Sequence, residues 1–364
     1  MKKFLRNPKG SRDWLPDEVA KQEFVRKSLV KVFELWGYQP IQTPILLNWD
    51  TISHGSNKLA DIAFKLIGQH GDILALRADL TTPIARVTAE RLQGEKLPFR
   101  FYYVGKVFRY HARKTTNEKE LYQIGIELIG VKEGAADLEC LKILIDGLKK
   151  LQIKRYLVLV NHSYLWSELF KVFGVIAQDL YKALTQKDFL LFDDIIQKSH
   201  LSKNEKNFWK ELIQIRGNKE ALNQLKNLLK KLKSPKKKRI KINKVTSYFD
   251  KLFKLFNANI ELDLSLTSDV DYYTGIYFEV ITPNLGRNIG SGGRYDQLLN
   301  KFGFNVPAIG FSLCLEDLLL VLERQEKNFP KFKEPKLILA KNVSSAFGTI
   351  NKFHTRNKNA AIKL

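Results

Sequence analysis

Four segments, far apart in the sequence, carry acids, phenols and an arginine that could together bind a small polar molecule. Carboxylates can bind an ammonium group, an arginine can bind a carboxylate or a phosphate, and amides and phenols can bind a heterocycle. Such a set suits an amino acid, particularly one with an imidazole. Each residue taken alone is better explained as a solvated or salt-bridged strand residue. The segments are LRADLTTP, GKVFRYHA, LYQIGIE and DYYTG, which supply Asp79, Thr81, Arg109, Gln123, Glu127, Tyr272 and Tyr273.

The elements expected around these residues would bring several of them together. Gln123 and Glu127 are four positions apart in the expected strand ELYQIGIELIGV, so their side chains should project from the same side. In ILALRADLTTPIARVTAERL we expect a strand, a turn and a helix that is capped near Thr81 or Thr82. The stretch SDVDYYTGIYFEV, residues 268 to 280, alternates aromatic and β-branched residues and predicts a half-buried strand. Arg109 is expected on the strand FRFYYVGKVFRYHA.

Composition limits the class of protein. With 364 residues, 44% hydrophobic and 11% aromatic, the chain can bury a substantial core. Its two cysteines, Cys140 and Cys314, are far apart and form no paired motif, so a disulfide framework is not expected and the compartment is predicted to be cytoplasmic. No apolar run reaches about 18 residues, and no apolar segment follows the first lysines, so neither a membrane span nor a secretory signal is expected.

Motifs for cofactors and metals are absent from the sequence. There is no phosphate-binding loop G-x-x-x-x-G-K-[ST], no G-x-G-x-x-G after a strand, no H-E-x-x-H and no C-x-x-C. The six histidines are scattered, and each is better explained as a surface or core residue than as a ligand. The glycines of GSGGRYD are explained as well by tight packing at a sheet turn as by phosphate binding. No cofactor and no metal site are therefore implied.

The net charge of +23 suggests a polyanion partner, but it is unevenly distributed. Residues 201 to 256 hold 17 Lys and Arg against 4 Asp and Glu, which is 17 − 4 = +13 of the total. We interpret this region as a lysine-rich, solvated helical surface, with nucleic-acid binding as the alternative.

The pattern of elements divides the chain into a core and an insertion. An amphipathic helix at residues 17–37, which Gly37 ends, is followed by strands and helices to residue 162. Residues 163–256 lose the strand pattern and predict a helical insertion. Strands return in residues 257–326, which close with the helix LCLEDLLLVLERQE. Residues 327–364 predict a short tail with one strand, KLILA, and no further full domain.

The segments FYYVGKVFRY and ELYQIGIELIG resemble the second motif of class II aminoacyl-tRNA synthetases. LRADLTTP and DYYTGIYFEV…GSGGRYDQLL narrow the resemblance to the histidyl branch, over about residues 7 to 325. The resemblance implies an α+β fold, with an antiparallel sheet flanked by helices and a helical insertion. It also implies a homodimer formed through residues 18–45, the first motif. In this family the seven residues above would form the histidine half of the site, with Asp79 in place of a glutamate.

Departures from the family pattern concern the ATP half of the site. Ser268 and Asp317 occupy positions where the synthetases carry an arginine, one for the α-phosphate and one stacked on adenine. We expect Asp317 to repel a triphosphate. His111 replaces a glutamate, and Thr116-Asn117 replaces the glycine and arginine of the following loop. The anticodon-binding domain of about 100 residues that ends the synthetases is also not expected here.

This combination resembles the regulatory subunits of ATP phosphoribosyltransferase, a family of synthetase paralogues. The resemblance implies no catalysis by this chain, a hetero-oligomer with a short-form catalytic subunit, and a role in the first step of histidine biosynthesis. L-histidine is the implied ligand for feedback, while tRNA and membranes are not expected as partners. Two alternatives remain: a divergent, active histidyl-tRNA synthetase, and a tRNA-binding module that uses the basic insertion.

Overall fold

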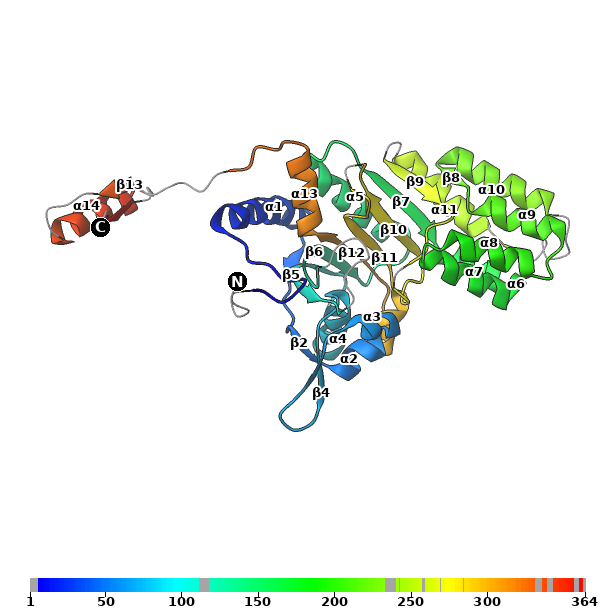
Figure 1. Cartoon of the computed structure of the whole chain (residues 1–364), viewed down its shortest axis with the longest axis horizontal. Helices are drawn as coiled ribbons and strands as arrows, with labels where there is room; N and C mark the ends of the chain where they lie inside the picture. The colour runs from blue at the N-terminus through cyan, green and yellow to red at the C-terminus, as the bar shows by residue number, and fades with distance from the viewer. Residues whose placement is uncertain are drawn as a thin grey trace.

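A nine-stranded mixed sheet runs through the core of the protein (Figure 1). The computed structural model describes residues 6–110, 118–232, 240–241, 243–256, 259–268, 270–283, 285–330, 336–338, 343–356 and 360–362. β1 pairs with β5 and β7 with β9 in parallel, and the other neighbours in the sheet are antiparallel. In spatial order the strands are β1 (Gln39–Pro40), β5 (Phe99–Phe108), β6 (Glu120–Ile129), β12 (Ala308–Cys314), β11 (Gly290–Arg294), β10 (Ile276–Ile281), β7 (Leu157–His162), β9 (Ile260–Asp263) and β8 (Arg216–Gly217).

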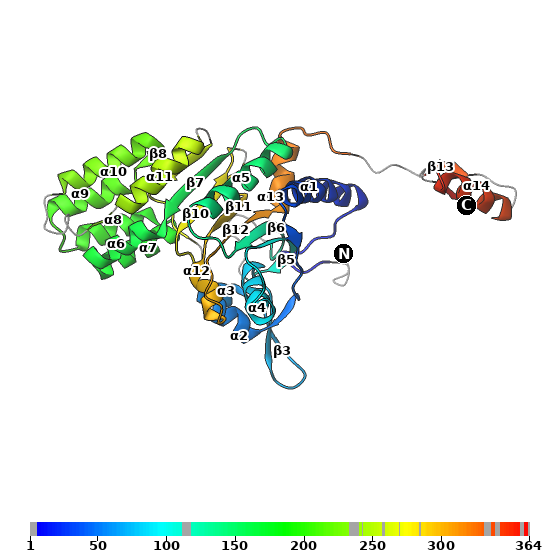
Figure 2. The same cartoon turned by 180° about the vertical axis from the view of Figure 1, so that it is seen from behind.

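Helices cover both faces of this sheet, as the α+β prediction requires. On one face lie α1 (Pro16–Leu35), α5 (Ala135–Lys150) and α13 (Leu315–Arg324) (Figures 1 and 2). The opposite face carries α2 (Trp49–Gly55), α3 (Asn57–Ile62), α4 (Thr81–Arg91) and α12 (Asp296–Lys301). Next to these helices, β2 (Leu46–Asn48), β4 (Ile73–Leu76) and β3 (Lys65–Ile67) form a small antiparallel sheet.

The alternation along β6 separates the two hydrophobic cores. Ile124 and Ile126 pack into the core shared with α1 and α5, while Leu121 and Ile129 pack into the core on the other face. Because neighbouring side chains of a strand point to opposite faces, Gln123 and Glu127 lie on the second face, as predicted. The period of two in ELYQIGIELIG therefore positions the polar residues of the candidate site.

The helical insertion packs against the far edge of the sheet. Its helices are α6 (Ser163–Phe173), α7 (Val175–Thr185), α8 (Phe189–Lys198), α9 (Lys203–Leu212), α10 (Lys219–Lys231) and α11 (Asn243–Leu255). The stretch QDLYKALTQKDFLLFDDIIQKS was expected to be helical, and the structure breaks it into α7 and α8 at Gln186–Asp188. The insertion also adds β8 to the edge of the sheet.

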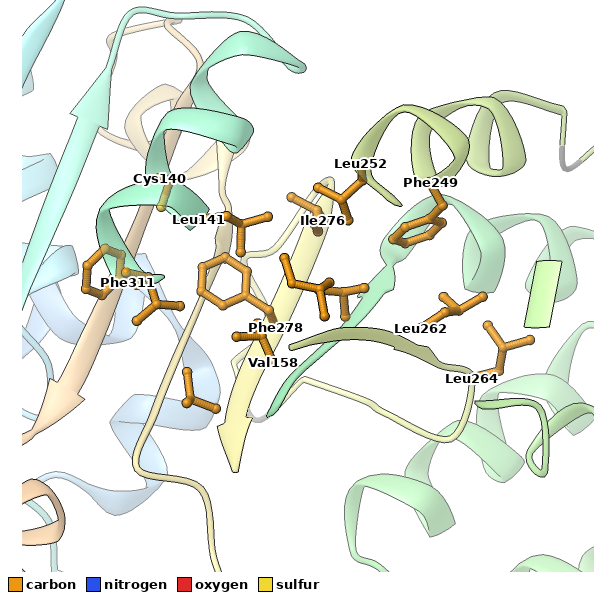
Figure 3. Close-up of a cluster of buried hydrophobic side chains, with 14 of the residues drawn as sticks. Cys140, Leu141, Val158, Phe249, Leu252, Leu262, Leu264, Ile276, Phe278 and Phe311 are labelled. Carbon is orange, nitrogen blue, oxygen red and sulfur yellow. The ribbon is translucent and has the colours of Figure 1, made fainter. Parts of the chain in front are cut away.

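One hydrophobic core runs from α5 across the sheet to the insertion (Figure 3). Cys140 and Leu141 of α5 lie over Phe278 of β10, while Phe249 and Leu252 of α11 cover the neighbouring strands (Figure 3). Since each of these side chains is at most 1% exposed, the insertion is fixed to the sheet by buried apolar packing.

The C-terminal part has more structure than the sequence suggested. One strand was predicted there, but β13 (Lys336–Ile338) pairs in parallel with β14 (Ala360–Ile362), and α14 (Val343–His354) connects them. Among the residues that the structure describes, no helix has the length and the apolar character needed to cross a membrane.

Candidate ligand-binding site

A cavity of about 510 Å³ opens on the second face of the sheet. Six of the seven predicted residues line it, and they come from the start of α4, the end of β5, β6 and the segment before β10. Sequence segments up to about 190 residues apart, from Asp79 to Tyr273, thus meet at one place. These six are Asp79, Thr81, Arg109, Gln123, Tyr272 and Tyr273.

Asp79 sits at the N-terminus of α4, where its carboxylate has two roles. Oδ2 accepts hydrogen bonds from the Thr82 backbone N at 3.0 Å and from Thr82 Oγ1 at 2.9 Å. Asp79 therefore provides the helix cap that we had expected from Thr81 or Thr82. Tyr272 OH lies 3.5 Å from the same oxygen. Burial raises the pKa of Asp79, against the hydrogen bonds from Thr82 and the positive charge of Arg109, which lower it.

Glu127 lies beneath the cavity and does not line it. Its Oε1 accepts a hydrogen bond from Thr81 Oγ1 at 2.7 Å, and Oε2 accepts one from the Tyr295 hydroxyl. The carboxyl group is almost completely buried, and this burial raises the pKa of Glu127 to about 8. Glu127 thus lies on the same face as Gln123, as expected, but it is not among the residues that line the cavity. The hydroxyl groups of Thr81 and Tyr295 stand between it and the cavity.

Tyr272 and Tyr273 lie in a loop, since β10 begins only at Ile276. Their rings meet edge to face at 5.3 Å between centroids, and Tyr272 also contacts Tyr295 at 5.9 Å. The three phenols form one wall of the cavity. The predicted strand thus starts later than expected, and aromatic contacts hold the segment before it.

Arg109 and Gln123 complete the polar lining near the sheet. Arg109 directly follows β5 instead of lying on it, and its Nε donates to the Ala78 carbonyl at 3.1 Å. Gln123 Nε2 lies 3.4 Å from Ser312 Oγ on the neighbouring strand. The side chains of Arg109 and Gln123 are therefore held by groups that line or border the cavity.

Glycines on the strands next to these side chains leave the space that the side chains occupy. A Cβ at Gly310 would lie 1.8 Å from Glu127 Oε2, and a Cβ at Gly125 would lie 2.0 Å from the Phe311 carbonyl oxygen. Any side chain at these positions would displace the Glu127 carboxyl group or the neighbouring strand. In GSGGRYD, a Cβ at Gly292 would lie 2.5 Å from the Gly310 carbonyl oxygen, which favours the tight-packing interpretation over phosphate binding.

Ser268 is fixed by local contacts. Its Oγ donates to the Val270 carbonyl at 2.8 Å and accepts from the Val270 N at 3.1 Å. Lys58 Nζ donates to the Ser268 carbonyl at 3.0 Å, so tertiary packing brings a cation to this segment. Asp271 contacts the N-terminus of α3, where its carboxylate accepts from the hydroxyl of the capping residue Ser56 and from the Asn57 N.

Asp317 forms an ion pair with Arg287, which the sequence did not indicate. Arg287 Nε lies 2.7 Å from Asp317 Oδ1, and the aspartate is 1% exposed. The expected repulsion of a triphosphate by a lone acid therefore does not apply, because a cation offsets the charge. Arg287 lines the cavity, whereas Asp317 does not. The other two departures, His111 and Thr116-Asn117, lie outside the described residues.

Several cavity residues were not predicted. Tyr295 belongs to the quoted GSGGRYD segment, where its place directly after a glycine-rich strand could have drawn notice. Arg287, Ser312 and Lys187 also line the cavity, but nothing in their local sequence marks them. Tertiary packing brings these residues to the cavity, and for Lys187 this is the packing of the insertion.

Comparison with known proteins finds relatives over most of the chain. A family model described as histidyl-tRNA synthetase matches residues 10–318. An ATP phosphoribosyltransferase regulatory subunit from Bacillus licheniformis is 36% identical over 330 residues, which cover 89% of this chain and 84% of the relative. The corresponding subunit from Carboxydothermus hydrogenoformans is 32% identical, and the match covers 87% of this chain and 96% of the relative.

Solved structures show the same fold. The crystal structure of an ATP phosphoribosyltransferase regulatory subunit/histidyl-tRNA synthetase from Bacillus halodurans C superposes with a TM-score of 0.85 at 28% identity, and covers 100% of this chain and 93% of that one. The apo histidyl-tRNA synthetase of S. aureus gives a TM-score of 0.70 at 20% identity, over 99% and 85% of the two chains, and shows the fold alone. The predicted architecture is therefore confirmed.

Proposed function

The chain belongs to the ATP phosphoribosyltransferase regulatory subunits, a family with the histidyl-tRNA synthetase fold, and we propose that it serves as the non-catalytic subunit of that complex. Its partner is a short-form catalytic subunit, and together they carry out the first step of histidine biosynthesis in the cytoplasm. The observation that carries the proposal is a cavity with amino-acid-binding side chains, while the two synthetase arginine positions hold Ser268 and Asp317.

Loss of the two arginines supports a role without adenylate chemistry. A phosphate that develops charge needs fixed cationic donors, and Ser268 offers only a hydroxyl that is engaged with Val270. Arg287 is oriented toward Asp317, so its guanidinium is shared with a buried carboxylate. Among the described residues, the positions of Ser268 and Asp317 thus provide no cation for a phosphate, and this difference supports regulation over catalysis.

The ligand we propose for the cavity is L-histidine, as the feedback effector. Asp79 and Gln123 hold the α-ammonium group, and Tyr272 faces the imidazole. Glu127 acts through the hydroxyl groups of Thr81 and Tyr295, because it lies beneath them. A buried acid and several oriented hydroxyls match a small zwitterion that carries a heterocycle.

Reconstitution with the short-form catalytic subunit tests the main proposal. The formation of phosphoribosyl-ATP is measured for each subunit alone and for the mixture. We expect turnover from the mixture only, together with co-elution in gel filtration. Equal turnover with and without this chain would contradict the proposal.

Calorimetry with L-histidine on the complex tests the ligand. Asp79→Asn removes the charge but keeps a good helix-capping residue, so we expect weaker binding with α4 intact. A charge-assisted hydrogen bond contributes about 1.5–3 kcal/mol, which corresponds to roughly ten- to a hundredfold in affinity. Asp271→Asn is the matched control, since the Asp271 carboxylate also accepts from a backbone N at a helix N-terminus but Asp271 does not line the cavity. Unchanged affinity in Asp79→Asn would rule out this pocket as the histidine site.

A further inference from the structure

The helical insertion forms part of the cavity wall. Thr185 at the end of α7, and Gln186 and Lys187 in the turn that follows it, line the cavity together with residues of the sheet. Figures 1 and 2 both place α7 at the side of the insertion that faces the core. A ligand in the cavity would therefore lie within reach of the insertion as well as of the core.

The conformation of this turn is well defined. The Lys187 N donates to the Leu184 carbonyl and the Asp188 N to the Ala183 carbonyl, both at 2.9 Å. Lys187 has a φ of 57°, a value in the left-handed region that favours glycine or asparagine. Asp188 then caps α8 through a 2.8 Å hydrogen bond from the Leu191 N. Hydrogen bonds on both sides thus hold a lysine at a position where glycine would be easier to accommodate.

A second contact ties α7 to the ligand-binding segment. The Ser268 N donates to the Tyr181 hydroxyl at 3.2 Å, and the Tyr181 ring packs edge to face on Trp166 at 4.9 Å. Tyr181 lies one helical turn before Thr185, whose hydroxyl donates to the Tyr181 carbonyl. The position of the turn is therefore fixed relative to the segment that leads to Tyr272.

The cations around the cavity differ in whether they could bind the carboxylate of a ligand. Arg287 is paired with Asp317, and Ser268 stands where the synthetases have a cation. Lys187 is exposed, and among the residues that the structure describes its ammonium group forms no ion pair or hydrogen bond. Arg109 also lines the cavity, but its charge acts on Asp79, whose pKa it lowers, and its Nε donates to the Ala78 carbonyl. An amino-acid zwitterion held by Asp79 at its ammonium group needs a cation for its carboxylate, and Lys187 is the cation on the side of the insertion.

We infer that Lys187 binds the carboxylate of the amino acid in this cavity, so that the helical insertion is part of the ligand site. The inference rests on the proposed function, since it assumes an amino-acid ligand beside Asp79. Lys187 is then a specificity-determining residue that distinguishes an amino acid from the corresponding amine. The insertion then contacts the ligand directly. Because the insertion also packs against the sheet, the ligand would lie between two parts of the protein that share one hydrophobic core.

A charge-specific titration on the full-length chain tests this role. Calorimetry compares L-histidine with histamine, which keeps the ammonium group and the imidazole but lacks the carboxylate. Lys187→Asn removes the charge with a residue that tolerates the left-handed conformation. We expect about a tenfold loss of histidine affinity with no change for histamine, whereas Lys187→Arg keeps most of the histidine affinity. Lys203→Asn, an exposed lysine of α9 outside the cavity, is the control and should change neither ligand.

The outcomes separate this inference from the proposed function. Unchanged histidine affinity in Lys187→Asn, or an equal loss for histidine and histamine, overturns the role of Lys187. If Asp79→Asn weakens histidine binding while Lys187→Asn does not, the pocket stands and only the inference fails. If the unmodified chain binds no histidine at millimolar concentration, the inference and the proposed ligand both fail.

Discussion

Arg287, in the segment between β10 and β11, reaches across to α13 and forms an ion pair with Asp317, with 2.7 Å between Nε and Oδ1. Asp317 is 1% exposed and Arg287 is 18% exposed, and Arg287 lines the cavity whereas Asp317 does not. The resemblance to the synthetases implies that an arginine stacked on adenine would stand at the position of Asp317. Here an acid and its own cation fill that place.

The first prediction concerns adenylate chemistry. We expect no histidine-dependent exchange between ATP and pyrophosphate by the purified chain, because one lost electrostatic donor commonly costs about 10²- to 10³-fold in rate and two are missing. Exchange with labelled pyrophosphate is the measurement, with an active histidyl-tRNA synthetase as the positive control. Exchange at synthetase-like rates would instead support the alternative of a divergent enzyme.

The second prediction concerns the stability of the Arg287–Asp317 pair. Arg287→Ala removes the arginine that pairs with a buried carboxylate, which should lower the free energy of unfolding by about 1–3 kcal/mol, less than for a fully buried pair because Arg287 is partly exposed. Urea denaturation measures the change. Arg216→Ala is the matched control, because Arg216 pairs with Glu261 in an exposed position and should change stability by less than about 1 kcal/mol.

A double variant shows whether charge is the cause. Replacement of both partners in Arg287→Leu/Asp317→Leu removes the buried acid together with its arginine and should recover most of the lost stability. If the double variant is no more stable than Arg287→Ala, packing and not the ion pair explains the loss.

The third prediction is the pH dependence that Glu127 introduces. Its pKa is raised to about 8 in the folded protein from an ordinary value near 4.5, so the folded state binds a proton that the unfolded state releases. Stability from this group is therefore complete below about pH 4.5 and is lost as the pH rises through about 8, by up to about 1.4 kcal/mol per pH unit. Urea denaturation between pH 5 and 9 measures the slope.

Glu127→Gln isolates this contribution. Glutamine keeps an oxygen that can accept from Thr81 or Tyr295 but does not titrate, so its stability should fall less steeply than that of the unmodified protein over the same range. Parallel curves for the two proteins would show that Glu127 is already ionised in the folded state. Other titrating groups contribute to both curves and cancel in the difference.

The sequence predicts those features that depend on local periodicity. The alternation of β6 determines which face carries Gln123 and Glu127, and the apolar positions of α1 determine its buried side, so both were expected. Tyr272 and Tyr273 were predicted to lie on a strand, because a run of aromatic residues has the same sequence pattern in a strand and in a loop. Their ring contacts with one another and with Tyr295 stabilise a loop instead.

Features that depend on tertiary structure could not be read from the sequence. Arg287 and Asp317 are 30 residues apart, and no spacing rule indicates that they pair. Lys187 lies in a stretch with uniform helical composition, so the turn that brings it to the cavity was not expected. The depth of Glu127 likewise depends on Gly310 of a neighbouring strand, which leaves room for its carboxyl group.

The last prediction is a homodimer through residues 18–45. Leu35, at the end of α1, is 79% exposed, and Ile45, after the Pro-bounded segment, is 45% exposed. Covering such side chains in a two-fold interface would remove apolar surface from water, at about 25 cal/mol per Å². We therefore expect light scattering to give the mass of a dimer at micromolar concentration, and the double variant Leu35→Asp/Ile45→Asp to shift it toward the monomer. Leu190→Asp on α8 is the matched control, since Leu190 is 86% exposed but lies in the insertion, and it should remain dimeric. A stable monomer for the unmodified chain would contradict the proposed dimer, and dissociation by Leu190→Asp would place the contact in the insertion instead.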